Sequence, residues 1–252
     1  MQKEFFNGED TINANLESEF NFREIELLEE PIENILIELE DEVNSGHYKM
    51  ILGDDASGRI PTDVFGGVIK SIYKEKNFEA PKIRFIPANP NIPEEPLDKR
   101  VRLFKKDLGA DKPDKILIIT DSIVSGEHLR PLVHSLKNNG IKFDVATIGV
   151  KGGDINVIKN LKVEFGCNIV FGALTVPNIY GKRYLGGVYK EYGDVVSRSR
   201  KKNAKKHEDL AYEGDQEAQK SINKARQDVN KLSGEIYEWY KQKQRDVDGD
   251  KN

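Results

Sequence analysis

Residues Ile116 to Gly126 read Ile-Leu-Ile-Ile-Thr-Asp-Ser-Ile-Val-Ser-Gly, and this stretch decides the fold that the sequence predicts. Its four leading apolar residues are typical of a buried strand. The acid Asp121 follows that strand, and Ser125 and Gly126 then open a helix. Main-chain N–H groups at the start of a helix attract anions, and a neighbouring carboxylate can accept hydrogen bonds from sugar hydroxyls. The stretch therefore predicts a turn that holds a sugar phosphate.

Strand and helix patterns alternate on both sides of this stretch. Apolar runs predict strands at Tyr48–Leu52, Lys82–Ile86, Lys115–Ile119, Phe143–Ile148 and Asn168–Leu174. Helical spacing predicts helices at Pro31–Val43, Ile60–Lys74, Lys99–Leu108, Glu127–Asn138 and Asp154–Phe165. Such alternation indicates an α/β fold with a mainly parallel, Rossmann-like sheet flanked by helices. Ligands of such a sheet bind beyond the carboxyl ends of its strands.

The composition is typical of a soluble protein with one core and charged extensions. Of 252 residues, 37% are hydrophobic and 33% are charged. No stretch contains the roughly 20 apolar residues that a membrane span needs, and the N-terminus has no secretory pattern. The single cysteine, Cys167, cannot form an internal disulfide. We therefore expect a cytoplasmic protein that does not bind a membrane.

Charge is unevenly distributed along the chain. Residues 1–45 contain 14 acids and two bases, whereas Arg198–Lys206 contains six bases and no acid. Two solvated faces are the simplest interpretation. The alternatives are that the two stretches pair within a chain or across a dimer, or that the basic run binds nucleic acid. The pI near 5.7 argues against nucleic acid, and we expect a homodimer that acts on small molecules.

Three further segments set the expected domain organisation. Gly53–Arg59 is a second strand-to-helix turn, and the four prolines between Pro87 and Pro96 exclude regular structure there. Near the C-terminus, apolar residues alternate spacings of four and three, which predicts a helix that either docks on the core or forms a coiled coil. These residues are Ala218, Ile222, Ala225, Val229, Leu232, Ile236 and Trp239. The expected units are an acidic arm and helix that form a hood or cover (1–45), a core (46–185), a basic linker (186–206), a helix (207–242) and a disordered tail (243–252).

With both turns in place, residues 45–185 resemble the type I phosphoribosyltransferases. The signature of that family is four apolar residues, two acids, two mostly apolar residues, a variable position and Thr-Gly. Asp121 stands at the second acid, Ser125 at the threonine and Gly126 at the glycine. Leu52–Thr62 is similar to the family's pyrophosphate loop, with Ser57-Gly58 at its glycine pair.

The resemblance implies a type I phosphoribosyltransferase fold and the transfer of a 5-phosphoribosyl group from phosphoribosyl pyrophosphate to a nucleobase-like nitrogen nucleophile, with Mg²⁺. The main-chain N–H groups of Ser122–Gly126 would hold the 5′-phosphate. The implied substrate-binding residues are Ser57, Gly58, Arg59, Thr120, Asp121, Ser122, Ser125, Gly126 and Tyr180. The implied catalytic residues are Lys99, Arg100 and Arg102, in the place of the family's mobile catalytic loop, and the implied Mg²⁺ ligands are Asp121 and Asp55.

The chain departs from the family pattern at three positions. Thr120 replaces the first acid, Val124 occupies the variable position where some members have a general-base aspartate, and His128 replaces a common second hydroxyl. These departures, together with the acidic arm and the C-terminal helix, motivate a second hypothesis. In it, the chain is a phosphoribosyltransferase-like module that binds phosphoribosyl pyrophosphate or nucleotides and acts on a partner.

Overall fold

The core of the protein is a five-stranded, all-parallel sheet. The computed structural model describes residues 19–54, 58–86, 94–108, 114–175, 188–191, 194–197 and 216–249. The strands are β1 (Tyr48–Asp54), β2 (Lys82–Ile86), β3 (Lys115–Ile123), β4 (Phe143–Val150) and β5 (Ile169–Ala173), in the order β2-β1-β3-β4-β5. This is a common order of doubly wound α/β proteins. The α/β class that the sequence predicts is confirmed.

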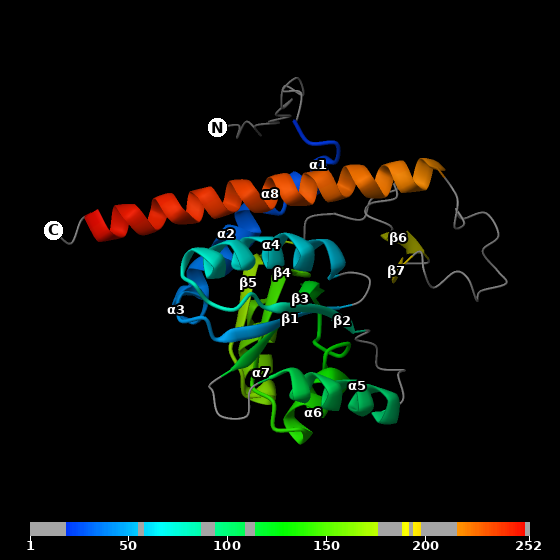
Figure 1. Ribbon diagram of the computed structural model, residues 1–252. Coiled ribbons are helices and arrows are strands. Elements are labelled where there is room, and N and C mark those ends of the chain that lie inside the picture. The colour runs from blue at the N-terminus through cyan, green and yellow to red at the C-terminus, as the bar shows by residue number, and fades with distance from the viewer. Residues whose placement is uncertain are drawn as a thin grey trace, which may run out of the picture.

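Helices cover both faces of the sheet (Figure 1). On one face lie α2 (Glu29–Glu38) and α4 (Arg59–Glu75), with α1 (Arg23–Glu26) and α3 (Glu40–Asn44) beside them. On the other lie α5 (Glu94–Asp107), α6 (Arg130–Asn138) and α7 (Ile155–Phe165). Apolar side chains of the strands alternate between these layers: Leu117 and Ile119 pack with the first, and Ile116 and Ile118 with the second. The sheet is therefore buried on both faces, as parallel sheets require.

The C-terminal helix α8 (Gln216–Gly249) docks on the core rather than standing free (Figure 1). Its buried side chains include Ala225, Leu232 and Ile236 of the predicted heptad seam. Two adjacent glycines in α4 make the close docking possible. A Cβ at Gly66 would lie 2.5 Å from Ile83 in the sheet, and a Cβ at Gly67 would lie 2.7 Å from Ser233 Oγ of α8. Helix α4 therefore fits between the sheet and α8 only with small residues at these two positions.

Some boundaries differ from the sequence prediction. Helix α5 begins at Glu94 and includes Pro96, because proline is tolerated in the first turn of a helix. Residues 186–206, predicted as a linker, contain an antiparallel pair, β6 (Val188–Glu191) and β7 (Asp194–Ser197). Both strands are rich in β-branched and aromatic residues, which favour strands.

Helix α8 also exceeds its predicted limits. It continues past residue 242 to Gly249, because residues 243–248 contain no proline or glycine and Gln242 donates a hydrogen bond to Asp246 one turn later. Of the expected tail, 243–252, residues 243–249 are thus helical. The other expected unit boundaries stay predictions. No helix among the described residues is long and apolar enough to span a membrane.

A buried carboxylate ties α8 to the segment that precedes α1. Asp228 is 2% exposed. Its two oxygens accept hydrogen bonds from the Asn21 side chain and the Phe22 main-chain N–H, each at 2.8 Å. The acceptor and the two donors are more than 200 residues apart in the chain. The contact therefore fixes the N-terminal segment and the C-terminal helix against each other.

Replacing Asp228 by alanine should lower the free energy of unfolding by about 1–3 kcal/mol, because the partly buried Phe22 N–H and the Asn21 amide lose their acceptor. Urea unfolding followed by circular dichroism measures the change. Gln227→Ala, at an exposed position of the same helix turn, is the matched control and should change stability by less than about 0.5 kcal/mol. Equal effects of the two substitutions would show that the tie does not contribute.

The amino edge of the sheet holds a compact network of charged and polar groups. The Glu42 carboxylate lies 2.6 Å from both His47 Nδ1 and Lys115 Nζ. Lys115 Nζ also lies 3.1 Å from Asp144, which accepts a hydrogen bond from the Tyr48 hydroxyl. Burial raises the pKa of Glu42, but the hydrogen bonds from Lys115 and His47 outweigh it and leave the pKa below its ordinary value.

This network predicts an acid-dependent loss of stability. Because the pKa of Glu42 is lowered by folding, its contribution is present above the ordinary carboxyl pKa and is lost as the pH falls through the lowered value. Glu42→Gln should therefore cost about 0.5–1 kcal/mol near neutral pH, since the pair is partly exposed. Urea unfolding of both proteins across the acidic range should show the difference shrinking as the pH falls. A difference that does not change with pH would contradict the prediction.

Candidate functional site

The two predicted turns lie side by side at the carboxyl edge of the sheet. Strand β1 pairs in parallel with β3, and Gly53 is in register with Ile119. The chain leaves β1 toward β2 on one side, and it leaves β3 toward β4 on the other. Between β1 and β3 the direction of winding therefore reverses, and this reversal creates the crevice where α/β proteins bind ligands. Gly58, at the end of the first turn, and residues 124–126, directly after β3, flank that crevice.

The first turn is pressed against β3. A Cβ at Gly58 would lie 2.6 Å from the Ile119 carbonyl oxygen and 2.8 Å from Asp54 N, so no larger residue fits there. The Gly58 N–H donates to the Asp54 carbonyl oxygen at 2.9 Å, which closes the turn. Helix α4 begins at Arg59, and no side chain caps its first turn. Its N-terminus is therefore held beside the end of β3.

The start of α4 is held by its own packing. The Arg59 guanidinium lies 4.9 Å from the centre of the Phe85 ring, over its face. Thr62 is fully buried against Gly53, where a Cβ would lie 2.6 Å from Thr62 Oγ1. Among the described residues, Thr62 Oγ1 has no hydrogen-bond partner. Asp63 is half-buried, and burial raises its pKa against the opposing effects of Arg59, Lys70 and Arg226.

The second turn offers a run of main-chain donors. Strand β3 continues through Ile123, whose carbonyl accepts from the Lys151 N–H at 2.9 Å. Helix α6 begins only at Arg130, after a bend and a turn. In between, the N–H groups of residues 124–128 donate no hydrogen bond to any described residue. Of the predicted donors Ser122–Gly126, Ser122 and Ile123 belong to β3, and the N–H groups of 124–126 are among the open donors.

Gly126 is required by the shape of this turn. Its φ is +72°, and a Cβ would lie 2.6 Å from a Leu161 methyl group on α7. Ser125 and Val124 are exposed, and Ser122 is half-buried. The Ser122 hydroxyl lies 3.4 Å from the Asp121 carboxylate. The turn is therefore held closed on its protein side, and its donors and the Ser125 side chain remain on the open side.

Asp121 and Thr120 point to different layers. Along β3, Leu117 and Ile119 face the α4 layer, and the alternation of side chains places half-buried Asp121 on that same side. It therefore lies on the side of the Gly58 turn. Thr120, at the position of the missing acid, is 3% exposed. Its hydroxyl is enclosed in the sheet layer and is a poor partner for a ligand in the crevice.

The structure also places Lys151, which was not predicted as a site residue, beside the second turn. Lys151 follows β4 and is exposed, and its main-chain bond to Ile123 places it beside the second turn. Gly152 and Gly153 follow with φ of +83° and +68°. The Gly-Gly pair directly after a predicted strand is the sequence signal that could have indicated this residue.

The remaining predicted residues lie apart from this crevice or outside the described residues. Lys99, Arg100 and Arg102 are exposed on α5, a helix that packs on the sheet through Leu97 and Val101. Asp55, Ser57 and Tyr180 lie outside the described residues. Among the described residues, no group of three or more acids, histidines or cysteines could hold a metal ion. The catalytic and Mg²⁺ assignments therefore stay predictions.

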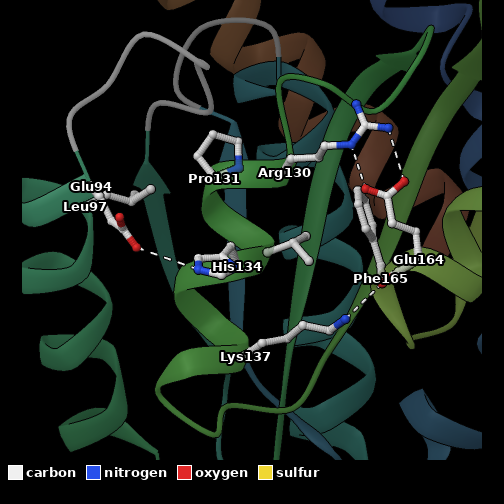
Figure 2. A pocket seen from close by; sticks show the side chains of 9 residues that line it. Glu94, Leu97, Arg130, Pro131, His134, Lys137, Glu164 and Phe165 are labelled. Carbon is white, nitrogen blue, oxygen red and sulfur yellow. Dashed lines mark hydrogen bonds and ion pairs between the residues drawn. The ribbon is translucent and has the colours of Figure 1, made fainter.

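A separate groove of about 560 Å³ lies on the layer formed by α5, α6 and α7, and it includes none of the predicted site residues (Figure 2). Its charged groups pair with one another. Arg130 lies 2.6 Å from Glu164, His134 lies 3.7 Å from Glu94, and Lys137 Nζ donates to the Glu164 carbonyl at 2.9 Å. We interpret this groove as packing between α5, α6 and α7 rather than as a reaction site.

Comparisons with known proteins add little to this geometry. No family model and no curated protein matches the chain. Among solved structures, the chain is similar to an orotate phosphoribosyltransferase from Aeropyrum pernix, at 12% sequence identity and a TM-score of 0.32. The match covers 56% of this chain and 68% of that one. A likeness of this strength carries no argument about activity.

The constraint on Gly126 can be tested by substitution. Gly126→Ala places a side chain at positive φ, which costs about 1–2 kcal/mol, and drives a methyl group into Leu161, which costs roughly another 1–3 kcal/mol. Gly140→Ala is the matched control, because Gly140 has φ of +65° but nothing within 4 Å of its Cβ position. Thermal and urea unfolding should therefore show a larger loss for Gly126→Ala. Equal losses would mean that the contact with α7 is not restrictive.

Proposed function

We propose that this protein is a phosphoribosyltransferase-like enzyme that transfers a 5-phosphoribosyl group from phosphoribosyl pyrophosphate to a nucleobase or base-like nucleophile with Mg²⁺. One observation carries the proposal. The two turns that resemble the family's phosphate-binding loops end adjacent parallel strands and flank the crevice where the winding reverses. The second of them has open N–H groups and a carboxylate beside them.

Each group has a defined task in this proposal. The N–H groups of residues 124–128 and the Ser125 hydroxyl hold the 5′-phosphate, with Lys151 as a nearby cation. Asp121 accepts hydrogen bonds from the ribose hydroxyls. The Gly58 turn and the N-terminus of α4 hold the pyrophosphate. Lys99, Arg100 or Arg102 would neutralise charge on the leaving group.

Mg²⁺ in phosphate sites is bound through one or two carboxylates and otherwise by substrate oxygens and water. Half-buried Asp121 can supply one such ligand, and Asp55 is the second candidate. That donor set fits Mg²⁺ bound together with the substrate, and it does not suit a metal held by the protein alone. When bound, Mg²⁺ would neutralise the charge on the pyrophosphate that leaves.

A second candidate function is a binding module without turnover. The burial of Thr120 favours it, because the position of the family's first acid then offers the sugar no carboxylate and no exposed hydroxyl. Such a module would bind phosphoribosyl pyrophosphate or a nucleotide through the same turns and act on a partner. The homodimer and the cytoplasmic location are further parts of the proposal, and each can be measured on the purified protein and in cells.

Pyrophosphate release from phosphoribosyl pyrophosphate, with Mg²⁺ and a panel of nucleobases, tests the enzyme. We expect turnover with at least one base. Asp121→Asn should lower the rate roughly 10- to 150-fold, because a hydrogen bond to a charged group contributes about 1.5–3 kcal/mol. Glu79→Gln, an exposed acid in the segment before β2, is the matched control and should leave the rate unchanged.

Binding measured by calorimetry separates the two candidates. Binding of phosphoribosyl pyrophosphate that is weakened by Asp121→Asn, without turnover on any base, would support the binding module. The absence of both binding and turnover in the wild-type protein would contradict both functions.

A further inference from the structure

A cleft at the opposite, amino edge of the sheet is lined mainly by positively charged residues among its charged groups. Its volume is about 680 Å³, within the range of small-molecule sites. It lies between the loop from α6 to β4 and the loop from α7 to β5. Its lining contains four lysines, Lys115, Lys137, Lys142 and Lys162, and one acid, Asp144. These charges come from separate elements, so the cleft exists only in the folded chain.

The one acid in the lining is already fully engaged. Asp144 is 3% exposed. One of its oxygens accepts from the Tyr48 hydroxyl at 2.9 Å and from Lys115 at 3.1 Å, and the other accepts from the Asn168 N–H at 3.2 Å. Lys115 is also paired with Glu42. Both oxygens of the Asp144 carboxylate therefore already accept hydrogen bonds, and neither of them pairs with Lys142 or Lys162.

Two helices end at this edge, and their carbonyl groups are a second possible source of negative charge. Lys105 and Lys137 already donate hydrogen bonds to these carbonyl groups. Lys105 Nζ donates to the Asn139 carbonyl at 2.8 Å, and Lys137 Nζ donates to the Glu164 carbonyl at 2.9 Å. The ammonium groups of Lys142 and Lys162, both exposed, have no hydrogen bond or ion pair with any described residue. In the groove of Figure 2, by contrast, the charged groups pair with one another.

We propose that this cleft is a second anion site, separate from the crevice, which binds a small molecule that carries phosphoryl groups. Two unpaired cations beside low-dielectric walls concentrate a positive potential in the cleft, and Phe143, Phe165 and Ile141 provide such walls. Lysine ammonium groups bind phosphate oxygens as point charges. A ligand with two or more negative charges would satisfy both lysines at once. The opposite edges of one sheet would then each bind a phosphorylated molecule, and the amino-edge site would be suited to regulation.

The single cysteine of the chain provides a site-specific probe. Cys167 lines the cleft and is partly buried. Burial is the main reason that the pKa of its thiol is raised, to about 12. At neutral pH the group is therefore a thiol, and its slow alkylation by N-ethylmaleimide depends on access from the cleft. An anion bound across Lys142 and Lys162 would obstruct that access.

The experiment follows the rate of Cys167 alkylation in the full chain by mass spectrometry, with inorganic pyrophosphate as the probe and potassium chloride at equal ionic strength as the reference. At ten times the dissociation constant of the probe, the rate should fall about tenfold, since only the unoccupied protein reacts. The double substitution Lys142→Gln and Lys162→Gln should abolish this protection. The matched control, Lys106→Gln with Lys159→Gln, alters two exposed lysines outside the cleft and should keep it.

Asp121→Asn separates the two edges of the sheet. Protection that persists in this variant supports a site at the amino edge. Protection that disappears in Asp121→Asn, that survives the loss of Lys142 and Lys162, or that chloride reproduces would each overturn the proposal. Circular dichroism of every variant checks that a changed rate does not come from unfolding.

Discussion

The parallel pairing of β1 with β3 is the constraint on which the rest of the structure depends. Gly53 and Ile119 are the last paired residues of the two strands, and β3 then continues alone on this side to Ile123. The first turn therefore lies beside the end of β3, at the position where the neighbouring crossovers diverge and α/β proteins bind ligands. The absence of a side chain at Gly58 then lets the first turn contact the β3 main chain directly. That contact keeps the first turn close to the residues that follow the apolar run of β3.

Helices α4 and α8 hold the first turn in place beside β3. Helix α4 starts at the first turn and continues between the sheet and α8, where Gly66 and Gly67 allow close contact on both sides. Ser233 of α8 lies 3.0 Å from the Val64 carbonyl of α4, within hydrogen-bond distance. Helix α8 is in turn fixed to the N-terminal segment through Asp228. The N-terminus of α4, which faces the crevice, is thus positioned by residues from both ends of the chain.

Sequence patterns predicted those features that depend on short-range periodicity. The five strands appear as apolar runs, and Gly58 and Gly126 appear as small residues at strand-to-helix turns. Patterns failed to predict the end of β3, which is set by main-chain hydrogen bonds. Thr120, Asp121 and Ser122 are polar, so the apolar run ends before them, yet their main chain continues the ladder with β4 as far as the pairing of Ile123 with Val150. Hydrogen bonds of the main chain leave no trace in side-chain periodicity, so the sequence did not show that Ser122 and Ile123 belong to the strand.

Patterns also failed where charges meet through tertiary folding. Lys142 and Lys162 are separated by a strand and most of a helix, and in the sequence each is an ordinary surface lysine. Only the folded structure shows that both lysines line the same cleft. The burial of Thr120 was equally invisible, because a threonine after an apolar strand can face either layer. Thr120 is only 3% exposed, so its hydroxyl does not replace the missing acid in the crevice.

The choice between enzyme and binding module rests on how the two parts of a phosphoribosyl ligand are held. In the proposed site, main-chain N–H groups after β3 would bind a phosphate whatever residue stands at position 120, so affinity for the phosphate end would not depend on the missing acid. The ribose end would depend on Asp121, because the buried Thr120 adds little there. Transfer requires the ribose to be oriented, and binding alone does not. Loss of the first acid would therefore reduce turnover more than affinity, and an active enzyme would have to orient the sugar through Asp121 and the pyrophosphate turn.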